Sequence, residues 1–388
     1  SPMSRGLGDV YKRQAYMSAN SRIYKSTDAG DNWTEIYYLG GNAYEFLIDP
    51  TNPNIIFSAT GEGLLHSTDA GTNWSTIFSE QCWDVNFKPG SVDTIYLLKN
   101  NSAAKRDELF RSDDGGASWT LKDNGYYVPA VFAEASTNGG KIAVSEAAPD
   151  LVYAGLIGNS KAGDNGWIGI YRSTDCGENW VNPVGHDGGP YDAGAGYPYM
   201  AGYSSGYHQG FYNYDLEVSD IDPGKIFVGT IFLHISADSG RTFTNISHPH
   251  ADQQDIDVNG SEIWLASDGG LDLSTDEMTT FESRKNGIAA SAYWRLGSGW
   301  NDDILVGGRY HNGDAALFMP NYGAGNSLFL GAAEQGTGYL NPLNNRISYF
   351  SDLGSSPVLP ESLTGQMAYL PKLSLFPNEG YTLKRSEL

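Results

Sequence analysis

Cysteine and basic residues are scarce in this chain of 388 residues. Only Cys82 and Cys176 are present, and they lie in different parts of the chain, so we expect no disulfide framework. Lysine and arginine together number 24, against 46 acidic residues, and the formal net charge is −22. Because a nucleic-acid binder needs a basic face, we expect no nucleic-acid partner.

Long apolar runs and long amphipathic helical patterns are also missing. We therefore expect no membrane span and little helix. What the chain has instead is 48 glycines, 17 prolines and 25 tyrosines. This composition favours short strands joined by many turns, and it predicts an all-β fold.

The first fourteen residues, SPMSRGLGDVYKRQ, resemble a translated sequencing-adapter read-through. They lack the apolar core of a signal peptide. We expect residues 1–14 to be non-native and residues 15–388 to form one domain that is incomplete at one or both ends. On this interpretation the natural N-terminus is missing.

One short motif is repeated along the chain. The pattern S-x-D-x-G-x-x-W/F starts at residues 26, 67, 112, 173 and 236, and a sixth copy at 274, STDEMTTF, lacks the glycine. An apolar segment such as GLLHS, ELFRS or GIYRS precedes the motif. The shortest spacings are typical of one four-stranded propeller blade, and the longer ones indicate inserted loops.

The chemistry of this motif fits a hairpin turn. Serine and aspartate side chains accept hydrogen bonds from nearby backbone N–H groups, and glycine adopts positive φ. The spacing of an EF-hand calcium loop is absent, and a catalytic residue needs no five copies. We therefore assign a structural role to Asp28, Gly30, Trp33, Asp69, Gly71, Trp74, Asp114, Gly116, Trp119, Asp175, Gly177, Trp180, Asp238, Gly240 and Phe243.

These motifs resemble the Asp-box (BNR) repeats of sialidase-like and sortilin-like β-propellers, over most of residues 15–281. HQGFYNYDLEVS, HADQQDI, SDGGLDLSTD and ILVGGRYHNG further resemble landmarks of bacterial secreted sortilin-like and glycosidase-like proteins. Two departures occur: Gln254 replaces a histidine, and RYHNG replaces Q-D-N-G. The resemblance implies a β-propeller of seven or eight four-stranded blades, secreted or at the cell surface, and we expect a monomer.

Candidate ligand-binding residues lie outside the repeated motifs. The segment Tyr191–Asp215 carries seven tyrosines among glycines, and aromatic faces with polar tips suit sugar rings or peptide side chains. A packed loop without a ligand is the alternative. Two further turns carry titratable or cationic side chains. The candidates are Tyr203, Tyr207, His208, Tyr212, His250, Asp252, Arg309 and His311.

The histidine turn SHPHADQQD with ASDGG also raises metal and catalytic possibilities. Its His and Asp residues are metal-ligand types, but a hydrogen-bonded polar cluster is the more ordinary interpretation, and we assign no metal and no cofactor. Asp252 and Asp268 are the candidate carboxylate pair of a glycoside hydrolase.

The catalytic sets of related enzymes do not carry over to this chain. The F-R-I-P stretch of sialidases is absent, and the turns lack the R-T-D-x-G-G form of xyloglucanase-like propellers. Fold alone does not establish a reaction. We expect a non-catalytic module that binds a glycan or a protein. The alternatives are a polysaccharide-acting glycoside hydrolase and a structural scaffold within a longer protein.

Overall fold

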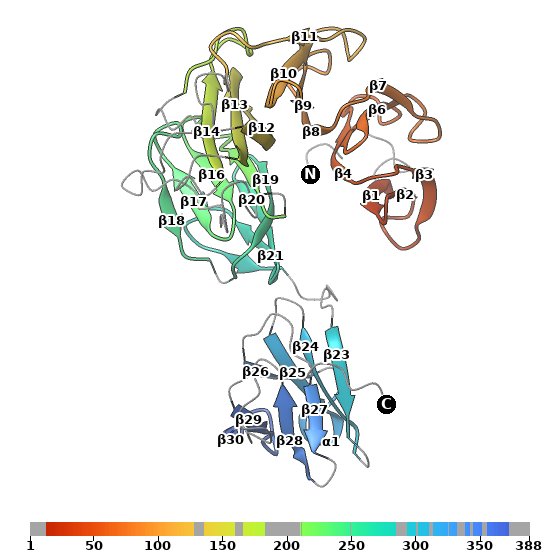
Figure 1. Ribbon diagram of the computed structural model, residues 1–388, viewed down its shortest axis with the longest axis vertical. Helices are drawn as coiled ribbons and strands as arrows, with labels where there is room; N and C mark the ends of the chain where they lie inside the picture. Colours follow the sequence, from red (N-terminus) through yellow and green to blue (C-terminus); the bar gives the residue numbers. More distant parts are fainter. Residues whose placement is uncertain are drawn as a thin grey trace. The chain divides into compact units, whose positions relative to one another are not determined.

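Figure 1 shows the computed structural model of the chain. It describes residues 13–127, 136–159, 166–182, 210, 212–248, 250–284, 293–299, 302–309, 313–324, 326–331, 338–341, 344–350 and 355–371. These residues form two compact units, which are treated separately below: Ser1–Ser267 with Leu271–Arg284, and Asp268–Gly270 with Lys285–Leu388. The single domain expected over residues 15–388 stays a prediction.

The first unit contains six antiparallel sheets, each a meander in sequence order. Their strands are β1 (Ala15–Ala19), β2 (Arg22–Ser26), β3 (Thr34–Tyr38); β4 (Ala43–Ile48), β5 (Ile56–Thr60), β6 (Gly63–Ser67), β7 (Ser75–Phe78); β8 (Cys82–Phe87), β9 (Ile95–Asn101), β10 (Arg106–Ser112), β11 (Thr120–Leu121); β12 (Ser136–Ser145), β13 (Ala148–Asn159), β14 (Trp167–Ser173); β15 (Asp215–Val218), β16 (Ile226–Gly229), β17 (Leu233–Ser236), β18 (Thr244–Ile246); and β19 (Gln253–Asn259), β20 (Glu262–Ser267), β21 (Gly270–Ser274), β22 (Glu282–Ser283).

The second unit contains two sheets of four strands. Their elements are β23 (Tyr293–Ser298), β24 (Ile304–Arg309), β25 (Gly313–Phe318), the short helix α1 (Met319–Tyr322), β26 (Leu328–Gly331), β27 (Gly338–Asn341), β28 (Asn344–Phe350), β29 (Ser355–Val358) and β30 (Ala368–Pro371). No helix in the described ranges is long and apolar enough to span a membrane.

The predicted fold class is confirmed: the chain is an all-β β-propeller protein. The described residues form eight sheets, six of four strands and two of three. The apolar segments expected before the repeated motif are strands β6, β10 and β14. Cys82 and Cys176 are both free thiols.

Successive sheets of the first unit pack face to face. The second strand of a sheet is the most buried; in β5 every residue is buried, whereas the fourth strand β7 is half exposed. Phe57 and Leu64 of one sheet pack with Val85 and Ile95 of the next. Because both faces of a blade are covered, its middle strands are buried and rich in apolar residues, and its outer strand is more exposed.

The repeated motif forms the turn between the third and fourth strands, and we call it the serine–aspartate turn. In the second copy Ser67 Oγ accepts a hydrogen bond from the Gly71 N–H at 2.8 Å and donates to Asp69 Oδ1 at 3.0 Å. Asp69 Oδ1 also accepts from the Asn73 N–H at 2.8 Å. The turn therefore satisfies its own polar groups with its own side chains.

Glycine in this turn meets two physical demands. Gly71 has φ of +84°, and a Cβ there would lie 2.8 Å from the Ile36 side chain of the preceding sheet. Trp74 then turns back, and its Nε1–H donates to the Gly71 carbonyl at 2.9 Å. In the sixth copy Met278 occupies the glycine position with φ of +62°, and its N–H still donates to Ser274 Oγ. The turn thus tolerates a side chain where the neighbouring sheet leaves room.

Candidate functional site

The first strands of the sheets face one another in the first unit. On β12, Lys141 Nζ lies 3.3 Å from Asp215 Oδ1 of β15 and 3.6 Å from Glu45 Oε2 of β4. β8 contacts both β4 and β12, and β15 contacts both β12 and β19. These side chains therefore converge from different sheets on one region between the first strands, which we call the inner strands; we call this region the central channel.

A β-bulge begins several of these inner strands. The register shifts between Ala43 and Glu45 and between Cys82 and Asp84, so that one extra residue precedes each acid. The same shift occurs before Asp255. Bulges re-aim side chains and are common beside functional sites. Here each bulge directs a carboxylate toward the start of the strand, at the end of the blade opposite the serine–aspartate turns.

Two of the acids link neighbouring inner strands. Asp84 Oδ2 accepts from the Ile142 N–H at 2.6 Å, and Asp215 Oδ2 accepts from the Ile256 N–H at 2.7 Å. Inner strands of adjacent blades share no ladder, so their edge N–H groups need other acceptors. These buried carboxylates supply them and fix the spacing of the strands around the channel.

We call the group at this end of the channel the channel-mouth cluster. It contains one amino group and six carboxyl groups: Lys141 with Glu45, Asp84, Asp215, Glu217, Asp255 and Asp257. Asp84 and Asp215 form a buried floor, only 2% and 3% exposed. The Glu45 side chain is 34% exposed, and Asp255 and Asp257 are exposed. The rim of the cluster is therefore open to a ligand.

Glu45, Asp84, Glu217 and Asp255 hold their protons more tightly than usual, because their pKa values are raised. Burial, together with the neighbouring carboxylates and against the attraction of Lys141, raises the pKa of Glu45 to about 7 and that of Asp255 to about 6. Asp255 touches water yet is enclosed by channel walls and other acids, which explains its raised pKa. Burial also raises the pKa of Asp84 and, strongly, that of Glu217.

Lys141 stays positively charged despite its surroundings. Burial alone would lower its pKa, but the carboxylates of Asp215, Asp84 and Glu45 outweigh this effect and hold the pKa well above its usual value. One fixed cation thus faces several acids that compete for it. Carboxyl groups outnumber amino groups six to one in the cluster, so it can attract an additional cation.

Aromatic side chains flank the cluster. Tyr44 and Trp83 are the bulged residues that precede Glu45 and Asp84, and their rings lie 5.2 Å apart. Tyr44 is 38% exposed, and its hydroxyl accepts from Gln81 Nε2. An exposed aromatic face beside carboxylates suits a cationic or amphipathic ligand.

Part of the site predicted from the sequence adjoins this mouth. Tyr212 is exposed, and Asn213 Nδ2 donates to Asp252 Oδ1 at 2.9 Å, so the end of the tyrosine-rich segment meets the histidine turn. Asp252 has φ of +59°, and its N–H donates to the Ile231 carbonyl. Both segments lead directly into inner strands β15 and β19.

The histidines of this turn contact the turn itself and strand β21. His250 Nδ1 lies 2.8 Å from the Ala251 carbonyl, and His248 Nε2 lies 3.3 Å from Asp272 Oδ2. A pocket of about 290 Å³ lies beside them, with Phe232 on its wall. Within the described ranges, no three His, Cys, Asp or Glu side chains gather as metal ligands would.

The remaining predicted residues belong to the second unit or lie outside the described residues. Asp268 and Arg309 belong to the second unit, where Arg309 Nε donates to the Gly313 carbonyl at 3.3 Å and the guanidinium lies over the Phe329 ring. Four candidates lie outside the described residues: Tyr203, Tyr207, His208 and His311.

The sequence analysis missed the channel-mouth acids. Four of the six follow an aromatic or amide residue and precede an apolar one, as in AYEFL, CWDVN, NYDLE and QQDID. This local pattern is a weaker sequence signal than the serine–aspartate motif. Only the register of the strands shows that the acids lie close together.

Comparisons with known proteins support the fold. The chain matches no protein-family model and no curated protein sequence. Among solved structures it resembles PorZ, a surface component of the type-IX secretion system of Porphyromonas gingivalis, with 14% identity over 95% of this chain and 47% of that one, at a TM-score of 0.51. The shared feature is the fold.

Two further solved structures are similar at lower scores. One is an ancestral GH74 enzyme, with 14% identity, 90% of this chain and 66% of that chain covered, and a TM-score of 0.41. The other is YCF48 bound to D1 peptide, with 13% identity, coverage of 77% and 88%, and a TM-score of 0.46. The chain thus spans about half the length of PorZ and just under two thirds of the GH74 enzyme.

Proposed function

We propose that this chain is a non-catalytic Asp-box propeller that acts outside the cell and binds a basic segment of a protein at its channel mouth. The Asp-box identity and the location rest on the sequence resemblance. The observation that carries the ligand is the channel-mouth cluster, in which six carboxyl groups surround one lysine.

Electrostatics favours a cationic ligand here. Like charges held close together raise one another's pKa, and a cation among them lowers it again. A lysine or arginine side chain that enters beside Glu45 and Asp255 would neutralise repulsion already present in the free protein. The Tyr44 ring adds a cation–π surface at the rim.

A glycan is the other ligand class that the sequence left open. Sugar rings would stack on the same aromatic faces. A neutral glycan, however, leaves the repulsion among the acids in place, and an anionic one increases it. The basic protein segment is therefore the ligand that this geometry supports best.

The test measures binding of labelled short peptides by fluorescence anisotropy. A peptide rich in lysine and arginine is compared with one carrying glutamate at each basic position. The double variant Glu45→Gln/Asp255→Asn removes two acids from the open rim. We expect it to weaken binding of the basic peptide by at least roughly tenfold, while the acidic peptide does not bind.

A charge-matched control separates the site from the overall charge. Asp31 and Asp93 are exposed and lie at the opposite end of their blades. At pH 8, above the pKa of both rim acids, Asp31→Asn/Asp93→Asn makes nearly the same change in net charge as the rim variant. Equal weakening in both double variants would reduce the effect to non-specific attraction. Binding of a neutral oligosaccharide without peptide binding would replace the proposed ligand by a glycan.

A glycoside hydrolase is the second candidate function, and one observation favours it. The pKa of Glu45 is raised to about 7, as in a general acid, and a second carboxyl group, that of Asp215, faces the same lysine. Release of reducing ends from a polysaccharide panel, lost in Glu45→Gln, would establish the hydrolase. Asp252→Ala and Asp268→Ala variants test the pair predicted from the sequence in the same assay.

A further inference from the structure

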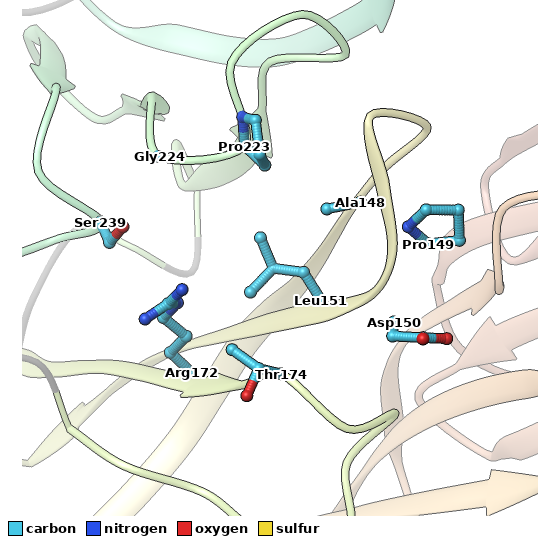
Figure 2. Close-up of a pocket in the computed structure, with 9 residues that line it drawn as sticks. All are labelled: Ala148, Pro149, Asp150, Leu151, Arg172, Thr174, Pro223, Gly224 and Ser239. Carbon is cyan, nitrogen blue, oxygen red and sulfur yellow. The ribbon is translucent and has the colours of Figure 1, made fainter.

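A second pocket lies at the other end of the blades, between the sheets β12–β14 and β15–β18. It has a volume of about 310 Å³ and is shown in Figure 2. Thr174 and Ser239, from two successive serine–aspartate turns, line it together with the turn that contains Pro223. It is therefore distinct from the channel mouth, which lies at the opposite ends of the strands.

Arg172 is the cation of this pocket. It directly precedes Ser173, the first residue of a serine–aspartate turn, and Figure 2 shows its guanidinium directed into the space between Ser239 and Leu151. Its side chain hydrogen-bonds the Tyr153 hydroxyl, but in the described part of the chain its Nε is shielded from solvent without a hydrogen-bond partner, and the guanidinium forms no ion pair. A buried donor left unpaired is costly, so the site favours an incoming acceptor.

The equivalent positions in other blades show the usual arrangement. Lys25 Nζ donates to the Ala70 carbonyl of the next turn at 3.0 Å. Arg111 Nη1 donates to the Cys176 carbonyl at 2.7 Å and pairs with Glu178 at 2.8 Å. At both junctions the cation closes the gap between blades. At Arg172 the pocket leaves the gap open, and no carboxylate among the described residues pairs with the guanidinium.

The carboxylate that lines this pocket is already engaged. Asp150 accepts from Lys88 Nζ at 2.5 Å and from Cys176 Sγ at 3.1 Å. In Figure 2 its carboxyl group points away from Arg172. Asp150 therefore belongs to the neighbouring junction, and its charge does not serve Arg172.

We propose that this pocket binds the carboxylate of an acidic side chain from a protein partner. The Arg172 guanidinium offers the two parallel N–H donors that match a carboxylate, and Thr174 and Ser239 line the same pocket. Leu151 and Pro223 form an aliphatic wall for the methylene stem. None of the residues that line the pocket is aromatic, so it offers no platform for a sugar ring.

The size of the pocket fits this ligand. A volume of about 310 Å³ lies at the lower end of the range for small-ligand pockets and suits one side chain. An inorganic anion would reach Arg172 but leave the aliphatic wall exposed. A side chain of the length of glutamate would fill both parts at once.

The test follows the Nε–H resonance of Arg172 in the full chain by ¹⁵N NMR. The probe is glutamate blocked at both ends, compared with glutamine blocked in the same way. N-acetylglycine supplies a free main-chain carboxylate, and sulfate supplies a bare anion. We expect blocked glutamate to shift the Arg172 resonance and to bind at least roughly tenfold more tightly than the other three probes.

Variants locate the effect. Arg172→Gln should abolish binding of blocked glutamate, and Arg172→Lys should weaken it about tenfold because lysine keeps the charge but lacks the paired donors. Arg241→Gln, at an exposed arginine of the next turn, should change nothing. Circular-dichroism melts confirm that each variant is folded before titration.

Three results would overturn the proposal. Equal binding of blocked glutamine would show that the pocket does not recognise the negative charge of the carboxylate. Sulfate as tight as blocked glutamate would reduce it to a general anion site, and tighter N-acetylglycine would point to a chain terminus. A titration that leaves the Arg172 resonance unmoved would remove the site.

Discussion

At the scale of single residues, hydrogen bonds within the turn explain why one eight-residue motif recurs along the chain, in five full copies and a sixth that lacks the glycine. The serine of each serine–aspartate turn is buried, and its hydroxyl accepts from the N–H four residues later. The aspartate accepts hydrogen bonds from the other end of the turn. In the first copy, the Asn32 side-chain amide, the Asn32 backbone N–H and the Ser26 hydroxyl lower the pKa of Asp28 to about 2. The motif therefore builds a turn that needs no other partner.

The stabilising role of the serine hydroxyl can be tested by substitution. Ser67→Ala leaves the buried N–H of Gly71 without an acceptor, so it should lower the free energy of unfolding by about 1–3 kcal/mol. The exposed Ser75, whose hydroxyl donates to the His66 carbonyl, supplies the control Ser75→Ala with a loss below about 0.5 kcal/mol. Urea unfolding measures both. Equal losses in the two variants would contradict the role given to Ser67.

Residue types alone predicted these turns but not the channel-mouth cluster. The serine, aspartate and glycine act locally, within eight residues, so their chemistry is visible in the sequence. Glu45 and Lys141 are far apart in the chain and meet only because their strands share an axis. The resemblance placed the ligand site on loops, and the acids of the inner strands carried no such signal.

At the scale of elements, the inner strands β4 and β8 combine a bulge, an aromatic residue and an acid. The bulge directs the acid, and the acid takes the edge N–H of the next strand. Blades without a shared ladder are thereby tied at their inner edges. The bulge therefore precedes both an acid of the channel floor, Asp84, and an acid of the rim, Glu45.

Asp84 tests this link between blades. Its two oxygens accept from the N–H groups of Val85 and Ile142, and the side chain is 2% exposed. Asp84→Asn keeps the shape but replaces one acceptor by a donor, so it should cost about 1–3 kcal/mol. Hydrogen exchange should speed up at the Ile142 amide more than at amides in the middle of β13.

The control for this variant is Asp31→Asn at an exposed position of a turn. It removes the same charge and should leave both stability and exchange unchanged. Unaltered protection of the Ile142 amide in Asp84→Asn would show that the blades are held together without this contact.

Strand existence followed well from the sequence wherever the repeated motif is present. Apolar segments before the turns became third strands because neighbouring blades bury both of their faces. Beyond residue 281 the repeat ends, so the individual strands β23–β30 had no motif to mark them.

At the scale of the whole molecule, the channel-mouth cluster makes stability depend on pH. Glu45 has a folded pKa of about 7, above the unfolded value of about 4.3. The folded state therefore binds more protons between these values, and its stability falls as pH rises through this window. Buried His234, with a pKa lowered to about 4, acts in the opposite direction up to about pH 6.5.

A variant isolates the contribution of Glu45. Glu45→Gln cannot ionise, so its stability relative to the parent chain should rise steadily from pH 4.5 to pH 7 and level off above about pH 8. Thermal melts across this range measure the difference. A stability difference that stays constant with pH would show that the folded protein leaves the pKa of Glu45 unchanged.

The central claim is that the channel mouth accepts a cationic segment among acids that still hold protons. The most direct measurement is isothermal titration of the lysine- and arginine-rich peptide at pH 6.5 in buffers of different ionisation enthalpy. Binding should lower the pKa of Glu45 and Asp255 and release up to about one proton, and Glu45→Gln should reduce this release. Peptide binding that releases no proton, or releases as much in Glu45→Gln, would place the ligand elsewhere and contradict the account.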